Sequence, residues 1–167
     1  MDLDKTPLDP AELRAAFACV PQGVTAVCAL DAAGTPQGIA ASSFTPVSLD
    51  PPLISLCMAN TSTTWPKLRT VPRIGVSVLA HTQNDICRAL AARTGDRFAG
   101  VAHHVTEHGA VLLHGAVLWM EGTLEAELPA GDHQIALLRV QTIAAGPGGD
   151  PLVFQSSRFR HLVPAGN

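Results

Sequence analysis

The chain has 167 residues, a length that fits one domain able to bury roughly two thirds of the surface its unfolded form exposes. Its 11 basic and 14 acidic residues give a formal charge of −3 with no block of like charge, which argues against nucleic-acid and anionic-membrane partners. Aromatic residues make up only 4% and tyrosine is absent, so a base-stacking surface for single-stranded nucleic acid is not expected.

The first predicted element is a short amphipathic helix in "DPAELRAAFACV". Asp9 is expected to cap it, and Pro10 occupies the first helical position, where proline is favoured. Leu13, Phe17 and Val20 would then share one apolar face.

Strands joined by short turns follow. The segments 24–31 and 39–48 are apolar and flank the turn residues "AAGTPQG", which predicts a hairpin. The next elements are expected in this order: a strand over 51–60, a short helix, a strand over 73–80, and a second helix over 82–93 that Thr82 caps.

The second half begins with an irregular stretch, 94–115, which we interpret as a long excursion that covers a site. Strands resume over 116–128, 133–145 and 151–155. About seven strands against two or three short helices favour an antiparallel barrel over a doubly wound sheet. We expect one domain over 1–167, with a core of about 12–162 between short tails.

The four cysteines favour a reducing compartment. Cys19, Cys28, Cys57 and Cys87 each lie in an apolar stretch without C-x-x-C spacing, so we expect buried structural thiols. No run of about 18 apolar residues occurs, and the first ten residues lack a secretory apolar segment. The sequence therefore predicts a cytoplasmic protein without a membrane partner.

Familiar nucleotide and hydrolase motifs are missing. The chain contains neither G-x-G-x-x-G nor G-x-x-x-x-G-K-[ST], and it also lacks G-x-S-x-G. A Rossmann site, a P-loop and a serine-hydrolase elbow are therefore not expected.

The stretch "ANTSTTWPKLR" places hydroxyls before a short helix. Helix N-terminal amides and hydroxyls can together bind a phosphate, and Lys67 and Arg69 add positive charge nearby. The alternative is that one threonine caps the helix and the others are solvated.

Two further stretches leave alternatives open. Small residues from Gly38 to Ser43 would let a planar ring approach the strand backbone, although tight strand packing explains them equally well. His133 stands at the entrance of a strand, where an imidazole could contact a substrate or simply bond to the turn. The histidines of 103–114 could suggest a metal because His104 and His108 would share a helical face, but no cysteine or carboxylate pair completes a set, so no metal is expected.

Taken together, the chain resembles the flavin reductase-like family, the reductase components of two-component flavin-dependent monooxygenases. The resemblance rests on "GIAASSFTPVSLDPPLISLC", "NTSTTWPKLR", "RIGVSVLA", "DRFAGV", "GAVLWMEG", "GDHQIALLRV" and "PLVF", which occur in the family's order over residues 12–162. It implies a mainly β fold, a flavin-binding split barrel of about six antiparallel, Greek-key-like strands with short peripheral helices, assembled as a homodimer.

The resemblance also implies site residues. The isoalloxazine and ribityl chain would lie along a strand and its surroundings: Ala40, Ala41, Ser42, Ser43, Phe44 and Cys57. The phosphate would be held by Asn60, Thr61, Ser62 and Thr64, with Thr63 left to solvent or packing. Asp50, Pro51 and Pro52 would form a wall beside the flavin, Arg97 and Phe98 would line its outer part, and His133 would meet the nicotinamide as the catalytic residue.

The implied activity is hydride transfer from NADH or NADPH to FMN or FAD, with the reduced flavin diffusing to a partner monooxygenase. Two alternatives remain. One is a flavin-binding barrel that acts as an oxidase, redox sensor or carrier without using a nicotinamide. The other is a barrel that binds a different apolar ligand or serves as a scaffold.

Overall fold

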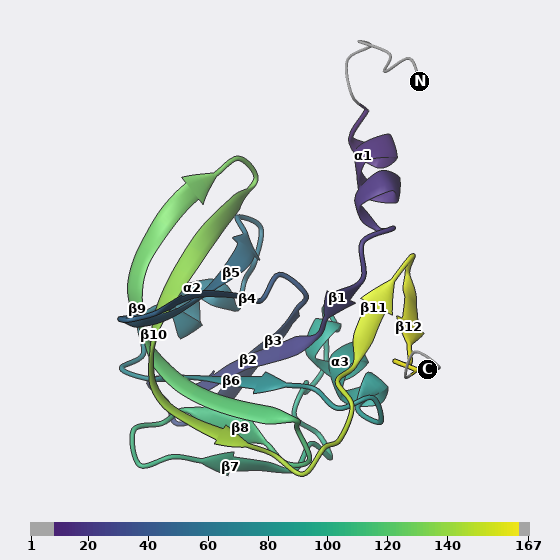
Figure 1. Cartoon of the computed structure of the whole chain (residues 1–167). Coiled ribbons are helices and arrows are strands. Elements are labelled where there is room, and N and C mark those ends of the chain that lie inside the picture. The colour runs from purple at the N-terminus through teal and green to yellow at the C-terminus, as the bar shows by residue number, and fades with distance from the viewer. Residues whose placement is uncertain (1–8, 164–167) are drawn as a thin grey trace.

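The computed structural model describes residues 9–163, and its largest element is a seven-stranded antiparallel sheet that curls into a barrel (Figure 1). The strands follow the spatial order β3 (Pro36–Ala41), β2 (Thr25–Leu30), β6 (Ile74–Val78), β9 (Leu118–Ala130), β10 (His133–Ala145), β5 (Pro52–Ala59) and β4 (Thr45–Leu49). The edge strands β3 and β4 are consecutive in the chain, so residues 42–44 join the two edges. The mainly β split-barrel prediction is confirmed, with seven strands in this sheet where about six were expected.

Four short strands were missing from the prediction. Two of them, β1 (Gln22–Gly23) and β12 (Arg158–Arg160), form a small sheet beside the barrel with the predicted β11 (Val153–Gln155). The other two, β7 (His103–Val105) and β8 (Val111–Leu113), form a hairpin within the stretch that the sequence presents as irregular. Strands of two or three residues are too short to produce a recognisable alternation.

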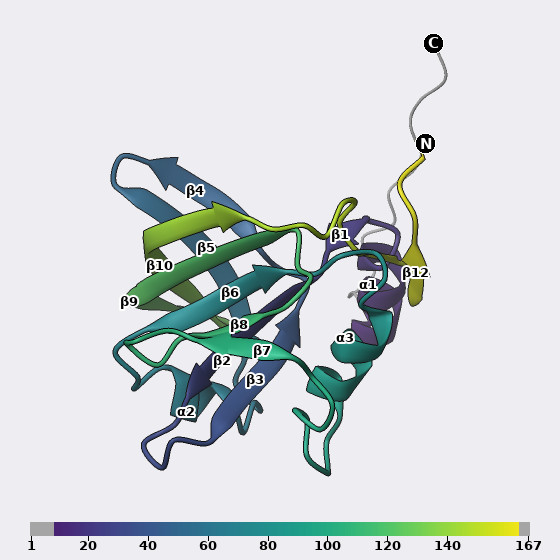
Figure 2. The same cartoon turned by 90° about the horizontal axis from the view of Figure 1, so that it is seen from below.

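Strand β2 is buried on both faces, which explains its continuous apolar sequence. Successive side chains of a strand point to opposite faces. Val27 and Ala29 belong to the cluster inside the barrel, while Ala26 and Cys28 belong to a second cluster outside it. Helix α3 (Asn84–Ala91) lies beside β3 and contributes Leu90 to that outer cluster (Figure 2). The barrel wall is therefore packed from both sides.

Helix α1 (Pro10–Phe17) has the predicted cap but buries none of its residues. Asp9 Oδ1 accepts hydrogen bonds from the backbone N–H groups of Ala11 and Glu12 at 2.6 and 3.3 Å. The apolar face remains exposed, with Phe17 65% and Val20 58% accessible. In Figure 1 the helix stands apart from the barrel, beyond β1.

The Thr82 cap predicted for α3 is wrong, and the threonine cap left as the alternative for the shorter helix does not form. Helix α2 (Trp65–Leu68) is a single turn in which Ser62 Oγ accepts the Trp65 N–H at 3.0 Å, and the Thr64 side chain makes no cap bond. Helix α3 follows Gln83, and Thr82 does not cap it. The longer Gln83 side chain instead ties down the turn, because its Oε1 accepts the Ala80 N–H at 2.8 Å.

Two cysteines are exposed, so the prediction of four buried thiols is wrong for Cys19 and Cys57. Cys19 follows the uncovered helix α1, and Cys57 faces away from the core on alternating strand β5. Cys28 is buried as expected, and burial raises the pKa of its thiol. Burial also raises the pKa of the partly buried Cys87.

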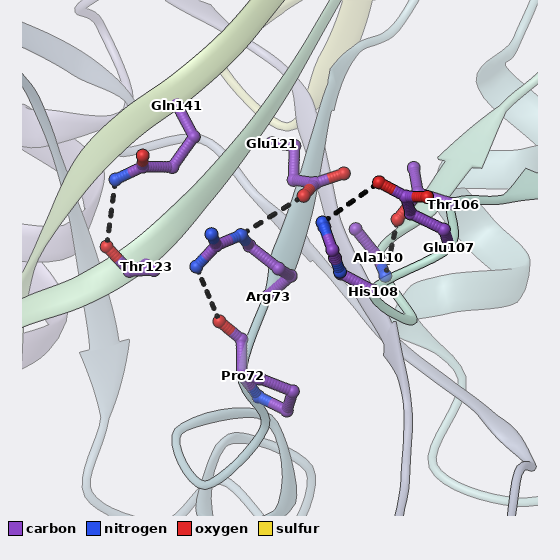
Figure 3. Close-up of polar contacts among 9 residues, drawn as sticks. All are labelled: Pro72, Arg73, Thr106, Glu107, His108, Ala110, Glu121, Thr123 and Gln141. Atoms are coloured by element: carbon purple, nitrogen blue, oxygen red, sulfur yellow. Dashed lines mark hydrogen bonds and ion pairs between the residues drawn. The ribbon is translucent and has the colours of Figure 1, made fainter.

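The histidine-rich segment adopts strand and turn structure, so the helical spacing assumed for His104 and His108 is wrong. His108 lies in the β7–β8 turn with Nε2 3.1 Å from Glu107 Oε1, as Figure 3 shows. The same view shows Arg73 Nε 3.2 Å from the buried Glu121 carboxylate. Over residues 9–163, no three His, Cys, Asp or Glu side chains gather as metal ligands. No helix among these residues is long and apolar enough to cross a membrane.

Candidate functional site

A cavity of about 320 Å³, here called the strand cavity, opens beside the junction of β3 and β4. It brings together six predicted site residues: Ala40, Ala41, Ser42, Ser43, Cys57 and His133. Ser62, predicted for the phosphate, also reaches it. The sequence did not single out Ile39, Met58 and Ala59, which neighbour the predicted residues along β3 and β5 and complete the lining.

Ser43 forms the bridge at this junction. Its Oγ accepts the Cys57 N–H at 2.8 Å and lies 3.3 Å from the Cys57 carbonyl oxygen, to which it can donate. A side chain thus replaces the backbone partner that a continuous ladder would provide. The chain leaves β3, crosses to β5 and begins β4, and the small side chains around this crossing leave room for a flat ring. Phe44, also predicted for the site, packs against the inner core cluster instead.

A second cavity of about 690 Å³, the arginine cavity, adjoins the first. The two cavities share Ile39, Ala40 and Ser62. The remaining lining residues come from the loop before α2, from α3 and from the segment after it: Thr61, Thr63, Thr64, Leu90, Ala91, Arg93 and Arg97. Arg93 was missed because only the packing of α3 beside β3 brings it to the hydroxyl loop.

The loop hydroxyls have different partners. Thr64 is buried, and its Oγ1 accepts a hydrogen bond from Arg97 Nη1 at 2.7 Å. Ser62 Oγ caps α2, whereas Thr61 and Thr63 are exposed at the cavity. Of the favoured hydroxyls, Thr61 is exposed, Ser62 is half-buried and Thr64 is buried, so Thr61 and Ser62 are the more accessible to a ligand.

Three polar residues near this loop are directed elsewhere. Asn60 bridges to the β9–β10 turn, because its Nδ2 donates to the Gly131 carbonyl at 3.1 Å. Lys67 Nζ donates to Gln37 Oε1, and Arg69 pairs with Glu127 at 2.9 Å. The positive charge at the arginine cavity therefore comes from Arg93 and Arg97, and not from the two cations that follow the hydroxyls in sequence.

A third hollow of about 680 Å³, the helix groove, lies between α1 and the barrel mouth. Its apolar lining includes Leu13, Phe17, Val20 and Phe154. It meets the strand cavity at Ser42 and His133. Arg14 and Asp132 line it too. The apolar stripe of α1 forms one wall of this groove, although such a stripe by itself predicts burial in a core.

His133 begins β10 opposite Ala59 of β5, at the boundary of the strand cavity and the helix groove. Its Nδ1 lies 2.7 Å from Asp132 Oδ1. This hydrogen bond is the main cause that lowers the pKa of Asp132. With Nδ1 donating to the carboxylate, Nε2 of a neutral imidazole is left as an acceptor.

Some predicted residues lie away from the cavities in this chain. Asp50, Pro51 and Pro52 form the exposed turn where β4 meets β5, at the end of the hairpin opposite Cys57. Phe98 packs against the outer core cluster and lies edge-on to His103. Gly38 lies directly behind it, where an added Cβ would come within 2.9 Å of the Phe98 ring.

The three hollows form one continuous surface whose chemistry changes along its length. Its centre is bordered by small side chains, one end carries hydroxyls and arginines, and the other end is apolar with one histidine. Each volume lies within the roughly 300–1,000 Å³ typical of small-molecule sites. The surface therefore combines a centre of small side chains with a region of hydroxyls and positive charge on one side and an apolar region on the other.

Comparisons with known proteins identify relatives over nearly the whole chain. The profile of the family described as "Flavin reductase like domain" matches residues 17–163. The chain is 40% identical to "Actinorhodin polyketide dimerase" of Streptomyces coelicolor, over 94% of this chain and 89% of that one. It is 31% identical to "Flavin-dependent monooxygenase, reductase subunit HsaB" of Rhodococcus jostii, over 94% and 80%.

A solved structure gives the same result. The NADH:FAD oxidoreductase SgcE6 of Streptomyces globisporus, described in complex with NAD and FAD fragments, superposes with a TM-score of 0.88. It is 34% identical to this chain and covers 95% of this chain and 96% of its own.

Proposed function

The chain belongs to the flavin reductase like family, and from this premise we propose that the strand cavity holds the flavin ring and the helix groove admits the reduced nicotinamide. The protein is an NAD(P)H-dependent flavin reductase that uses FMN or FAD. The observation that carries the placement is the shared boundary at Ser42 and His133, where two planar rings entering from different sides would meet.

When bound, the cofactors would supply the chemistry, a hydride passing from C4 of the reduced nicotinamide to N5 of the flavin. The chain's part is alignment, because hydride transfer needs the reacting atoms about 3 to 3.5 Å apart. Ala40 and Ala41 offer a wall without bulky side chains on one side of the cavity. The opening toward the groove leaves the other side accessible.

His133 is proposed to orient the nicotinamide. Its Nδ1 is held by Asp132, so Nε2 can accept a hydrogen bond from the carboxamide N–H₂ group. Arg14, in the same groove, supplies a positive charge for the phosphates of the dinucleotide. No paired carboxylates are needed, because the reaction transfers a hydride and the cofactors carry the chemistry.

The flavin phosphate is proposed to lie where the two cavities join. Ser62 lines both cavities, and Thr61 lines the arginine cavity beside it. Their hydroxyls would donate to the phosphate oxygens, and Arg97 would balance its charge. Thr64 would act indirectly by holding the guanidinium of Arg97.

A monooxygenase component is the partner class indicated by the relatives, one of which is described as the reductase subunit of such an enzyme. We propose that reduced flavin passes to it by diffusion. We also propose that two copies of this chain form a homodimer in the cytoplasm, a placement favoured by the free cysteines and by the mixed surface charge.

The test is steady-state oxidation of NADH and NADPH by the purified protein with FMN, FAD and riboflavin supplied in turn. Flavin-dependent loss of absorbance at 340 nm supports the proposal. Stable yellow colour without nicotinamide oxidation would instead support the flavin-carrier alternative, and neither colour nor turnover would favour a scaffold.

A further inference from the structure

The arginine cavity is larger than a single phosphate requires. It holds about 690 Å³ against about 320 Å³ for the strand cavity that would take the ring. FMN ends at the phosphate that Thr61 and Ser62 would bind. FAD continues with a second phosphate and an adenosine, which need further space in the same direction.

The two arginines of this cavity differ in how many hydrogen bonds their guanidinium groups make within the protein. Arg97 is held in place, because its Nε donates to the Ala92 carbonyl at 2.8 Å and its Nη1 donates to the Gly38 carbonyl at 3.0 Å. The same Nη1 also donates to Thr64 Oγ1. Arg93 is exposed on the cavity and, within residues 9–163, its guanidinium makes no hydrogen bond or ion pair.

A guanidinium without a partner in the described residues can bind a second phosphate. Five N–H donors in a planar fork match phosphate oxygens in a bidentate geometry. Arg93 follows the end of α3, while Ser62 lies on the opposite loop, so the two residues enter the cavity from different elements. The half-buried Ile39 and the exposed Ala91 add apolar lining for an adenine ring, and the buried Leu90 lies behind them.

We propose that this reductase selects FAD over FMN, and that Arg93 is the specificity-determining residue because it binds the phosphate that FMN lacks. The inference rests on the proposed function, since it places the first flavin phosphate at Thr61 and Ser62. It adds the identity of the flavin and a residue that contacts its distal half.

The experiment measures dissociation constants of riboflavin, FMN and FAD by quenching of flavin fluorescence, for the wild-type protein and for Arg93→Ala. Arg158→Ala is the control, because it removes the same charge from an exposed position on β12 outside the three hollows. We expect the wild type to bind FAD more tightly than FMN. Arg93→Ala should weaken FAD binding about 10-fold, alter FMN binding less than about 2-fold and leave riboflavin unchanged.

Different results would overturn the FAD preference or the proposed function itself. Equal loss of FAD and FMN affinity in Arg93→Ala, or a wild type that binds FMN as tightly as FAD, would overturn the inference while leaving the reductase intact. The same follows if Arg158→Ala reduces FAD affinity as much as Arg93→Ala. Failure of the wild type to bind any of the three flavins would overturn the proposed function itself, and thermal unfolding of both variants shows that they are folded.

Discussion

The strand cavity and the arginine cavity share three lining residues but are built from opposite kinds of group. The first is bordered by alanine, serine and strand backbone, and it recognises a ligand by shape. The second is bordered by threonines, serine and two arginines, and it recognises a ligand by charge and hydrogen bonds. All flavins share the same ring, whereas the number of phosphates differs among riboflavin, FMN and FAD.

This difference makes it possible to change ring binding and phosphate binding separately. Changes in the strand cavity should act on riboflavin, FMN and FAD alike, because all three carry the same ring. Changes in the arginine cavity should reduce affinity by an amount that depends on how many phosphates the flavin carries. Four further experiments test that separation, and they follow here in order of decreasing effect.

The largest effect is expected from filling the strand cavity. Ser42→Trp places an indole where the strand cavity meets the helix groove. All three flavins should lose affinity on the order of 100-fold, which corresponds to about 2.7 kcal/mol. Fluorescence titration measures it, with the exposed Thr45→Trp as the matched control. A loss of affinity for only one of the three flavins would contradict the idea that the strand cavity recognises the shared ring.

The next effect should distinguish phosphorylated flavins. In the double variant Thr61→Ala, Ser62→Ala, FMN and FAD should bind about 10-fold more weakly, because hydrogen bonds to a charged phosphate are lost. Riboflavin should change less than about 2-fold, since it has no phosphate. Loss of the Ser62 cap should also lower the free energy of unfolding by about 1 kcal/mol. Equal weakening of riboflavin would place the phosphate elsewhere.

A third substitution tests the side of the site that faces the groove. His133→Ala should raise the KM for the reduced nicotinamide about 10-fold, because a hydrogen bond to the carboxamide is lost. Flavin dissociation constants should stay near those of the wild type. The control is His104→Ala, an exposed histidine on β7. A KM that does not change would remove His133 from the nicotinamide site.

The smallest effect concerns the carboxylate that holds this histidine. The hydrogen bond from His133 lowers the pKa of Asp132, so any stability from the ionised form is present at neutral pH and is lost as the pH falls through the lowered pKa. Both side chains are accessible to water, so Asp132→Asn should lower Tm by at most about 2 °C at pH 7. Near pH 3 the two proteins should unfold at closer temperatures. A gap that widens in acid would contradict this sign.

Much of the barrel could be predicted from the chain because its strands carry strong local signals. The apolar run of β2, the "AAGTPQG" turn and the long alternating segments of β9 and β10 each predict a strand without knowledge of its partner. The resemblance then predicted that these strands close into an antiparallel split barrel. Caps were harder to predict, because the choice between Ser62 and Thr64 depends on which side chain reaches the free N–H.

The charged end of the site was predicted less well for a physical reason. Lys67 and Arg69 follow the hydroxyls in sequence but pair with residues of other strands, while Arg93 lies about thirty residues further along the chain. Proximity in sequence does not reveal which cation the tertiary packing brings to a loop. The role of α1 as a groove wall was likewise hidden, since its apolar stripe predicts burial in a core.

If the strand cavity holds the flavin as proposed, the Ser43 bridge would affect how long the flavin stays bound. A hydroxyl spans the point where β3 and β4 part, so a flavin beside it would rest against one wall of the barrel, with the exposed Cys57 and Thr61 at its edge. Release of the flavin would break contacts to the ligand but no hydrogen bond between strands. Residence time would then be set by the ring and phosphate contacts alone, which suits a protein whose product must travel to another enzyme before oxygen consumes it.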